Sequence, residues 1–337
     1  MALLFMDGFG GQDSNFKWDV GSATYTTATA TPRTPGNYYW TNGSGATVSM
    51  VKNFTASSRI FVGYGWYTSV DNSPVSFYGD GGVTQHITVV RNATTRFLEI
   101  RRGSAAGTLL ATGTQQVFNN QWNYIEISVT ISDTIGEVHV RLNGSSTDEV
   151  SYTGDTKNGG TATTLDKIHF TFPNAFANYF ADVYILNDTG ATNNTFLGDV
   201  TVRTLSPNGN GTSSQLVGSD GNSTDNYLLV DEHPYSATDY VGSATIGQKD
   251  TYTIANLPAG VSTVYGVQVS GMMAKSDSSL AQARYIVRSG GTDYGGTTRA
   301  LTTTYTGYYD LHETDPATGV AWTPGGVNNM ESGMEVM

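Results

Sequence analysis

The stretch FADVYILNDTGATNNTFLGDV, residues 180–200, indicates the fold class of this chain. Read as a strand, Phe180–Leu186 has apolar side chains on both faces, and one face carries Phe180, Asp182, Tyr184 and Leu186. A strand that is apolar on both faces is central and buried in its sheet. The residues from Asn187 to Thr195 are turn formers, too polar and too few for a helix with a core face. The stretch therefore predicts a buried strand, a loop and a second strand.

Alternating apolar and polar residues, the pattern of half-buried strands, recur before this stretch. From Asn123 to Ile131 the isoleucines and Val129 share one face, with Trp122 and Tyr124 on the other. After a turn at Asp133–Gly136 the pattern resumes and ends at Asn143-Gly144. These residues predict a hairpin. In Ile60–Trp66 one face carries large side chains and the opposite face includes Gly63 and Gly65, where missing side chains permit close packing or a bend. Turns recur about every 8 to 12 residues, the spacing of a β-sandwich.

The composition agrees with an all-β protein and excludes several functions. The 337 residues include 40 Gly, 20 Tyr and 13 Phe, and only 14% are charged. The chain has no cysteine, so it has neither disulfides nor thiolate metal sites. A net charge of −12 argues against nucleic acid or an anionic membrane as partner. The apolar run Ala2–Met6 is shorter than a secretory signal core, and no later run is long enough for a membrane span.

The chain length allows two domains. We expect one domain over residues 1–205, a polar linker or crossover over 206–228, and a smaller β domain over 229–337. In the last part, residues 265–273 and 283–288 alternate as strands do. Thr323 followed by Pro324 is a good helix start, so we predict one short helix that runs from Pro324 to about Ser332.

Motifs that would indicate catalysis are missing. The glutamates do not have the E-x-D-x-x-E or E-x-D-x-E spacing of sandwich glucanases, and the adjacent pair Asp148-Glu149 is typical of a turn surface. There is no G-x-S-x-G, and His312-Glu313 lacks the second histidine of a zincin helix. Residues 220–231 match EF-hand ligand offsets, but Asp225 replaces the required glycine. We predict no catalytic residue, no metal and no cofactor.

Carbohydrate binding is the ligand hypothesis that the aromatic residues support. Flat rings can stack on sugars, and asparagine and aspartate nearby can bind the hydroxyl groups. The candidates lie in two groups: Tyr38, Tyr39 and Trp40, and Tyr64, Trp66 and Tyr67. The alternative is that these rings belong to the core of a sandwich rich in tyrosine and tryptophan.

Four stretches in combination resemble tailed-bacteriophage virion proteins with a concanavalin A-like, laminin-G-like jelly roll. They are MALLFMDGFGGQDSNFKWDV, QWNYIEISVTISDTIGEVHVRLNG, FADVYILNDTGATNNTFLGDVTVRTLSPNGNGT and DPATGVAWTPGGVNNMESGMEV. The resemblance implies a double-sheet jelly roll over about residues 1–205, followed by a C-terminal β region. Within it, Phe180–Leu186 would be a central strand and Asp199–Arg203 a strand that leads out of the domain. No catalytic motif of the family can be transferred to this chain.

The resemblance also implies a role. We expect a non-enzymatic structural protein on the exterior of a phage particle, a tail-associated, fibre or capsid-decoration component. It would be made in the bacterial cytoplasm and would assemble with other virion proteins and as a homo-oligomer. The second hypothesis is an adhesin that binds host surface polysaccharide, and the third is a polysaccharide depolymerase.

Overall fold

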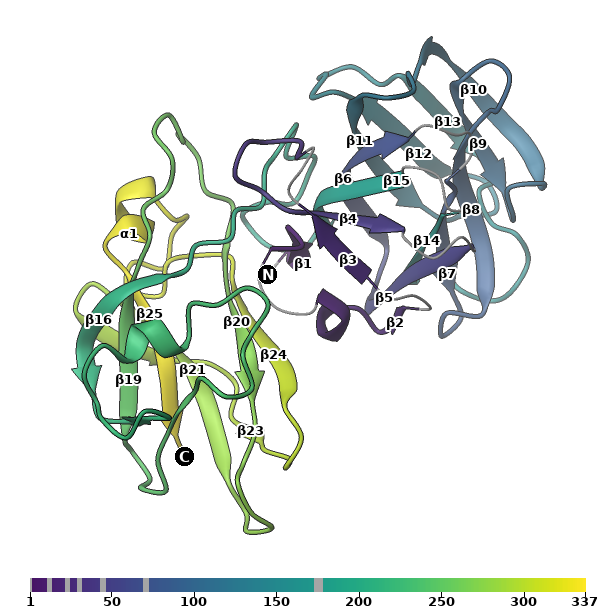
Figure 1. Cartoon of the computed structure of the whole chain (residues 1–337). Helices are drawn as coiled ribbons and strands as arrows, with labels where there is room; N and C mark the ends of the chain where they lie inside the picture. Colours follow the sequence, from purple (N-terminus) through teal and green to yellow (C-terminus); the bar gives the residue numbers. More distant parts are fainter. Residues whose placement is uncertain are drawn as a thin grey trace. The chain divides into compact units, whose positions relative to one another are not determined.

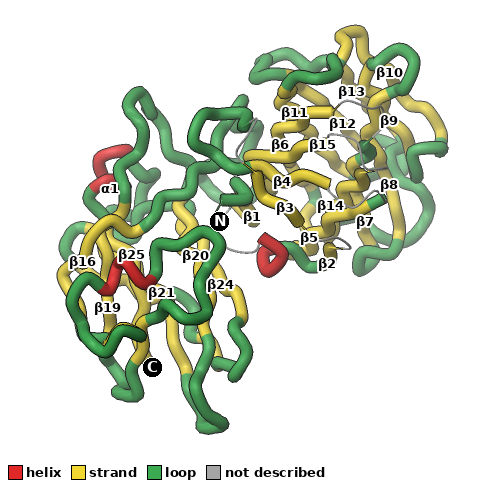
Figure 2. Tube along the Cα trace, viewed as in Figure 1, coloured by secondary structure: helices red, strands yellow, loops and turns green. Residues whose placement is uncertain are grey.

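The computed structural model describes residues 2–10, 14–21, 25–28, 32–42, 47–68, 73–172 and 178–337. The chain forms two compact units, residues 1–10 with 18–203 and residues 11–17 with 204–337. In the described residues both units consist of antiparallel strands and loops, with one α-helix, α1 (Pro324–Asn328), and two short 3-10 helices, η1 (Ser14–Lys17) and η2 (Asn226–Leu229) (Figures 1 and 2). The all-β class expected from the sequence is confirmed. No helix in these ranges is long and apolar enough to cross a bilayer.

The first unit is a sandwich of two sheets, sheet A and sheet B. Sheet A runs in the order β13-β12-β11-β6-β15-β4-β3, and β1 also pairs with β15. Its strands are β1 (Leu3–Asp7), β3 (Tyr25–Ala28), β4 (Tyr39–Asn42), β6 (Arg59–Thr68), β11 (Trp122–Thr130), β12 (Gly136–Leu142), β13 (Val150–Gly154) and β15 (Asn178–Asn187). Sheet B runs in the order β10-β9-β8-β7-β14-β5-β2. Its strands are β2 (Val20–Gly21), β5 (Val48–Ser57), β7 (Val75–Gly79), β8 (Thr84–Arg91), β9 (Phe97–Arg102), β10 (Thr108–Gln116) and β14 (Leu165–Phe172).

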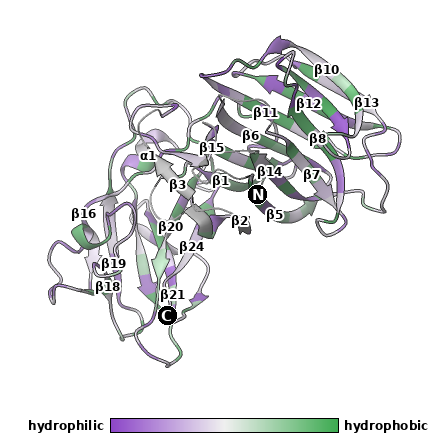
Figure 3. Cartoon of the chain, turned by 45° about the vertical axis from the view of Figure 1, so that its right-hand side comes forward, coloured by the Kyte–Doolittle hydropathy of each residue, from purple (hydrophilic) through white to green (hydrophobic). Residues whose placement is uncertain are grey.

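The core of this unit lies between the two sheets and is rich in aromatic rings. Phe170 of sheet B contacts Tyr64 and Phe180 of sheet A, with ring centroids 5.5 and 4.8 Å apart, and Trp40 contacts Phe172 at 4.7 Å. Apolar residues accordingly concentrate on the strands (Figure 3). Burial of these rings removes a large apolar area from water, which is the main stabilising contribution to such a fold. The expected jelly-roll sandwich is confirmed.

Strand β15 is central, as predicted, but its two faces are not those that strict alternation indicates. It pairs with β6 on one side and with β1 and β4 on the other. Between Ala181 and Tyr184, β15 has one residue more than the facing part of β6, and Asp182 has a φ of 53°. This β-bulge reverses the order of faces, so Phe180 lies opposite Trp66 and Ile185 lies opposite Val62 on the core side. The prediction that Phe180 and Tyr184 share a face was wrong, because a bulge is invisible to a two-residue period.

The hairpin predicted at residues 122–142 is confirmed as β11 and β12, with Ile127 opposite Val140. Asn143 and Gly144, which follow β12, both have positive φ, 53° and 73°, as a tight turn requires.

Residues 196–203, here called the strap, do not form the strand expected at Asp199–Arg203. They cross the outer face of sheet A, the face turned away from sheet B. Their polar backbone groups bond mainly to side chains of the sheet and of the segment before β4 instead of to a neighbouring strand. A strand forms when backbone groups bond to the edge of a neighbouring strand, whereas here side chains satisfy the backbone groups of the strap.

The second unit is built on a six-stranded sheet, and the segment 206–228 is part of it. The order is β16-β19-β25-β21-β22, with β23 also paired to β21, and β17–β18 and β20–β24 form two further pairs. The strands are β16 (Pro207–Ser214), β17 (Val217–Gly218), β18 (Val241–Gly242), β19 (Lys249–Ile254), β20 (Val267–Met273), β21 (Gln282–Ser289), β22 (Thr292–Gly295), β23 (Arg299–Ala300), β24 (Thr306–His312) and β25 (Glu331–Val336).

The structure therefore differs from the expectation of a linker at 206–228. Its polar composition is that of an edge strand, β16, held by buried polar groups. The buried carboxylate of Asp250 accepts hydrogen bonds from the amides of Gln215 and Leu216 and from the side chain of Asn226. Such contacts replace the apolar packing whose absence suggested a linker.

The helix predicted from Pro324 is present but ends at Asn328 instead of near Ser332. Its start is as expected, since the Thr323 hydroxyl accepts a hydrogen bond from the Gly326 amide at 2.9 Å. The next residues form β25, where a Cβ on Gly333 would lie 1.9 Å from the Asp250 carbonyl oxygen. The close approach of the two strands thus requires glycine at this position.

Candidate functional site

The six candidate sugar-binding residues do not lie together, because neighbouring residues of a strand point to opposite faces of the sheet. Trp40, Trp66 and Tyr64 are only 0%, 2% and 4% exposed and point into the core. No ligand can reach them, so for these three the core alternative holds. Tyr39 and Tyr67 lie on the opposite, outer face of sheet A, because neighbouring residues in a strand point to opposite sides. Tyr38, just before β4, is half-buried and is not a member of the ring group described next.

On the outer face, Tyr39 and Tyr67 meet two rings that were not among the candidates. Tyr67 lies directly opposite Trp122 on β11 and Tyr179 on β15. Its ring centroid is 5.0 Å from that of Tyr179 and 5.8 Å from that of Trp122, and Tyr39 is 4.7 Å from Tyr179. We call these four residues the aromatic row. Tyr67, Trp122 and Tyr179 are half-buried and Tyr39 is 3% exposed.

Partial burial and neighbouring rings act on the hydroxyl of Tyr179. Burial, with smaller effects of Tyr39 and Tyr67, raises the pKa of Tyr179, so its hydroxyl stays neutral and can donate a hydrogen bond at physiological pH. Tyr67, Trp122 and Tyr179 thus offer ring faces, and the two tyrosines offer phenol hydroxyls. Tyr39, which is as buried as Tyr64, only packs against Tyr179.

The hairpin pattern already placed Trp122 on the face opposite the isoleucines. That orientation was the sequence signal by which Trp122 could have been recognised as a residue of the outer face. Tyr179 precedes the quoted apolar stretch and had no such signal.

Next to the aromatic row, the outer face of sheet A is covered by Arg33. Gly65 and Tyr124 pair with each other and are the next residues on this face after the pair Tyr67 and Trp122. A Cβ on Gly65 would lie 2.7 Å from Cδ of Arg33, and the guanidinium lies 4.7 Å from the centre of the Tyr124 ring. The close packing expected at Gly65 is therefore present, and the group that fills it is a charged side chain.

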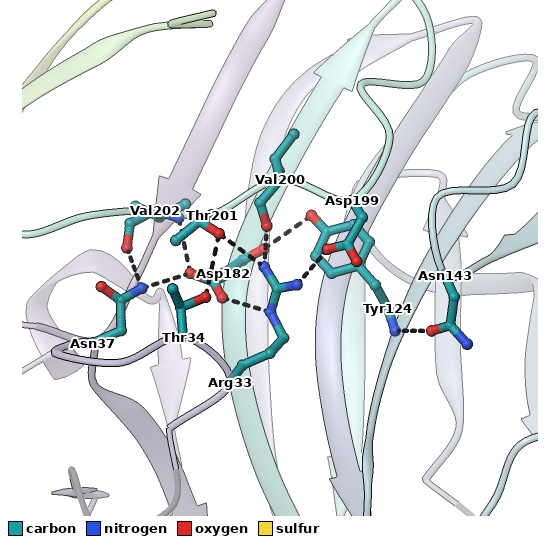
Figure 4. A network of polar contacts seen from close by, with 10 residues as sticks. All are labelled: Arg33, Thr34, Asn37, Tyr124, Asn143, Asp182, Asp199, Val200, Thr201 and Val202. Atoms are coloured by element: carbon teal, nitrogen blue, oxygen red, sulfur yellow. Dashed lines mark hydrogen bonds and ion pairs between the residues drawn. The ribbon is translucent and has the colours of Figure 1, made fainter. Parts of the chain in front are cut away.

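Arg33 is held by two carboxylates and one carbonyl (Figure 4). Its Nε donates to Oδ2 of Asp182 at 2.7 Å, Nη1 donates to Asp199, and Nη2 donates to the carbonyl of Val200. Burial alone lowers the pKa of Arg33, but Asp182 and Asp199 outweigh that effect and raise it. The guanidinium is permanently charged, and its donors on both sides are engaged by the protein itself.

Asp182, the residue of the bulge, organises this network. Its Oδ1 accepts from the Val202 amide at 2.8 Å and from the side chain of Asn37 at 3.2 Å, while Oδ2 accepts from Arg33 (Figure 4). The side chain is fully buried. Burial raises the pKa of Asp182, and Arg33 and the Val202 amide offset part of that rise. The network ties the strap and the segment before β4 to the sheet.

Farther along the face, the strap itself covers the sheet. The Tyr184 ring fills the space at Gly63, and its hydroxyl donates to Oε1 of Glu126, which also accepts from the Gly198 amide at 2.9 Å. Phe61 is the next residue on the same face of β6 after Gly63, and Phe196 of the strap packs edge-on against it, with ring centroids 5.2 Å apart. Glu126 is 1% exposed. Among the residues that the structure describes, the strap and Arg33 cover this part of the face and leave three rings of the aromatic row at its end half-buried.

In the ranges that the structure describes, no group of three or more histidine and carboxylate side chains is arranged to hold a metal ion. The chemistry of the site is thus that of aromatic faces, hydroxyls and a neutralised arginine.

No protein-family model matches the chain, and no curated protein is similar to it in sequence. Solved structures give fold-level likenesses. A Bacillus subtilis protein of unknown function with a galectin-like fold is 12% identical, with 55% of this chain and 96% of that chain covered and a TM-score of 0.40. A tetrameric galectin from the sponge Cinachyrella is 11% identical, with 41% and 99% covered and a TM-score of 0.31. The carbohydrate recognition domain of Emp46p is 8% identical, with 52% and 91% covered and a TM-score of 0.34. Likenesses at this level do not assign a ligand to this chain.

Proposed function

We propose that the first unit binds carbohydrate at the aromatic row. The observation that carries this proposal is that three half-buried rings, Tyr67, Trp122 and Tyr179, come from three adjacent strands and contact one another at one end of the outer face. The C–H bonds of a sugar ring can pack on the electron-rich face of an aromatic ring, and the phenol hydroxyls can bond to sugar hydroxyls. The same rings would stabilise the sheet as cross-strand pairs if no ligand bound.

Two buried carboxylates support a binding role without catalysis. Glu126 and Asp182 share the outer face with the aromatic row but are 1% and 0% exposed, and the strap bonds to both. A ligand on the row cannot reach either group. Glycoside hydrolysis needs two carboxyl groups placed on either side of the scissile bond.

The binding test compares a ring in the row with a ring elsewhere. On an array of bacterial envelope glycans, we expect Trp122→Ala and Tyr179→Ala to weaken binding at least about tenfold, a loss of about 1.4 kcal/mol. The matched control is Tyr78→Ala, which removes a half-buried tyrosine from β7 of sheet B and should leave binding unchanged. Equal binding by the folded Trp122→Ala protein would assign the row a purely structural role.

We further propose that the protein is a non-enzymatic component of the exterior of a tailed-phage particle, where it binds host polysaccharide and assembles with other virion proteins and with copies of itself. This proposal is supported by the resemblance of four sequence stretches to such proteins. A cysteine-free chain also suits folding in the bacterial cytoplasm. Mass spectrometry of purified particles should detect the chain, and immunogold labelling should place it on the tail or the capsid. Its absence from purified particles would refute this location.

A further inference from the structure

One loop, residues 117–121, joins β10 of sheet B to β11 of sheet A beside the aromatic row. The residue after the loop is Trp122, the first of β11. The Asn120 amide donates a hydrogen bond to the carbonyl of Thr68, the last residue of β6, at 2.8 Å. Since Tyr67 precedes Thr68, the loop is fixed directly beside two of the three half-buried rings.

Buried side chains of both sheets hold this loop in place. Arg91 of β8 is 1% exposed, and its Nε donates to the Val117 carbonyl at 2.8 Å while Nη2 donates to Oδ1 of Asn119 at 2.6 Å. The side-chain amide of Asn123, on β11, donates to two further carbonyls of the loop at 3.2 and 3.1 Å. A buried guanidinium is stable only when its N–H groups are bonded, and here the loop supplies acceptors. The arginine and the loop therefore fix each other.

Two side chains of the loop, those of Asn120 and Gln121, are exposed next to Trp122. The backbone of Asn120 has a φ of 59°, a left-handed conformation that asparagine tolerates. Each side chain ends in an amide, which donates through its nitrogen and accepts through its oxygen, and a sugar hydroxyl group can do both. Because the loop is already ordered, little conformational entropy is lost when it binds a ligand.

We infer that Asn120 and Gln121 select which sugar the aromatic row binds. A ring face packs against the C–H bonds of many sugars, whereas a hydrogen bond requires a hydroxyl group at one place and in one orientation. This inference rests on the proposed sugar-binding function and adds the residues that determine its specificity. The rings supply affinity, and the two amides on the fixed loop supply the choice between epimers.

The test is titration of the full chain with the methyl glycosides of glucose, galactose and mannose, followed by NMR of the sugar protons. Galactose and mannose each differ from glucose in the orientation of one hydroxyl group. We expect the wild-type protein to prefer one of the three sugars at least about tenfold, and the double variant Asn120→Gly, Gln121→Ala to reduce that preference below about threefold. Trp122→Ala should weaken the binding of all three sugars by similar factors. Glycine at position 120 adopts positive φ without strain, so the double variant should fold.

The matched control is Asn193→Gly, which makes the same change at a φ of 51° in the loop after β15, at the end of that strand remote from the row. It should keep both the affinity and the preference of the wild-type protein.

The outcomes separate this inference from the function on which it rests. If the folded double variant keeps the wild-type preference while Trp122→Ala weakens binding, the inference is overturned and sugar binding stands. Equal affinity of the wild-type protein for the three sugars, or binding to array glycans without binding to any of the three, would also overturn it. Silence of the folded wild-type protein toward these sugars and on the glycan array would refute the sugar-binding function and the inference together.

Discussion

Arg33 and Asp182 form an ion pair at 2.7 Å in which the carboxylate is fully buried and the guanidinium side chain is 10% exposed. The pair joins the segment before β4 to the bulge of β15, and through the Val202 amide it also holds the strap. The covering of the outer face of sheet A therefore depends on one ion pair, which no local sequence pattern predicts.

Removal of the Asp182 carboxylate should be costly. Asp182→Ala leaves Nε of the nearly buried Arg33 and the Val202 amide without their acceptor, so we expect a loss of about 3–5 kcal/mol in the free energy of unfolding. Urea denaturation of the wild-type and variant proteins measures it. Asp199→Ala removes the exposed partner of the same arginine and should cost less than about 1 kcal/mol. Similar losses in the two variants would contradict the assigned roles.

Gly63 should not tolerate even a methyl group. A Cβ there would lie 2.1 Å from the Tyr184 ring, which is buried against Glu126, so Gly63→Ala should destabilise the protein by about 1–3 kcal/mol. Thermal unfolding followed by circular dichroism provides the measurement. Gly242 is the matched control, because a Cβ added there would meet no atom within 4 Å and its φ is not positive. Gly242→Ala should change stability by less than about 0.5 kcal/mol.

Glu149 protects the edge of sheet B, although the sequence suggested only a turn-surface carboxylate. Its Oε1 accepts from the amides of Thr114 and Gln115 at 2.5 and 2.6 Å, and the side chain is 9% exposed. Glu149→Ala should lower stability by about 1.5–3 kcal/mol and should speed hydrogen exchange at these two amides. The neighbouring Asp148, bound to His139 and Arg141 on the surface, is the control, and Asp148→Ala should leave that exchange unchanged.

Stability should fall as the pH drops below about 6.5, because several histidines are neutral in the folded protein. His86 is fully buried, and its Nδ1 accepts from the Asn158 amide at 3.1 Å. Burial lowers the pKa of His86, so the unfolded chain binds a proton before the folded one does. The stabilisation is therefore complete above about pH 6.5 and is lost as the pH falls toward the lowered folded-state pKa.

The charged groups around His86 act on its pKa in both directions: Asp80, Asp166 and Asp133 raise it and Lys157 lowers it. Unfolding midpoints measured at pH 7 and at pH 5 should differ less in His86→Phe than in the wild-type protein. Some dependence should persist, because burial also lowers the pKa of His169, His233 and His312. An unchanged difference would exclude His86 as a contributor.

Which rings are available to a ligand could be predicted only in part. Alternation separates Trp40 from Tyr39 and Trp66 from Tyr67, but it does not say which member of each pair faces the other sheet. Both faces of β6 and β15 are covered, one by sheet B and the other by the strap and Arg33, so apolar content does not distinguish them. Trp122 and Tyr179 join Tyr67 only through strand register, which relates residues far apart in the chain.

The sequence by itself determined the all-β class, the central position of Phe180–Leu186, the hairpin at residues 122–142, the packing space at Gly63 and Gly65, and the capped start of α1. These features follow from side-chain periodicity, turn chemistry and missing side chains, which act over a few residues. The bulge at Asp182, the path of the strap and the aromatic row were decided by the tertiary structure. Each depends on a buried charge or a cross-strand contact between distant segments, and its free energy appears only when the sheets have assembled.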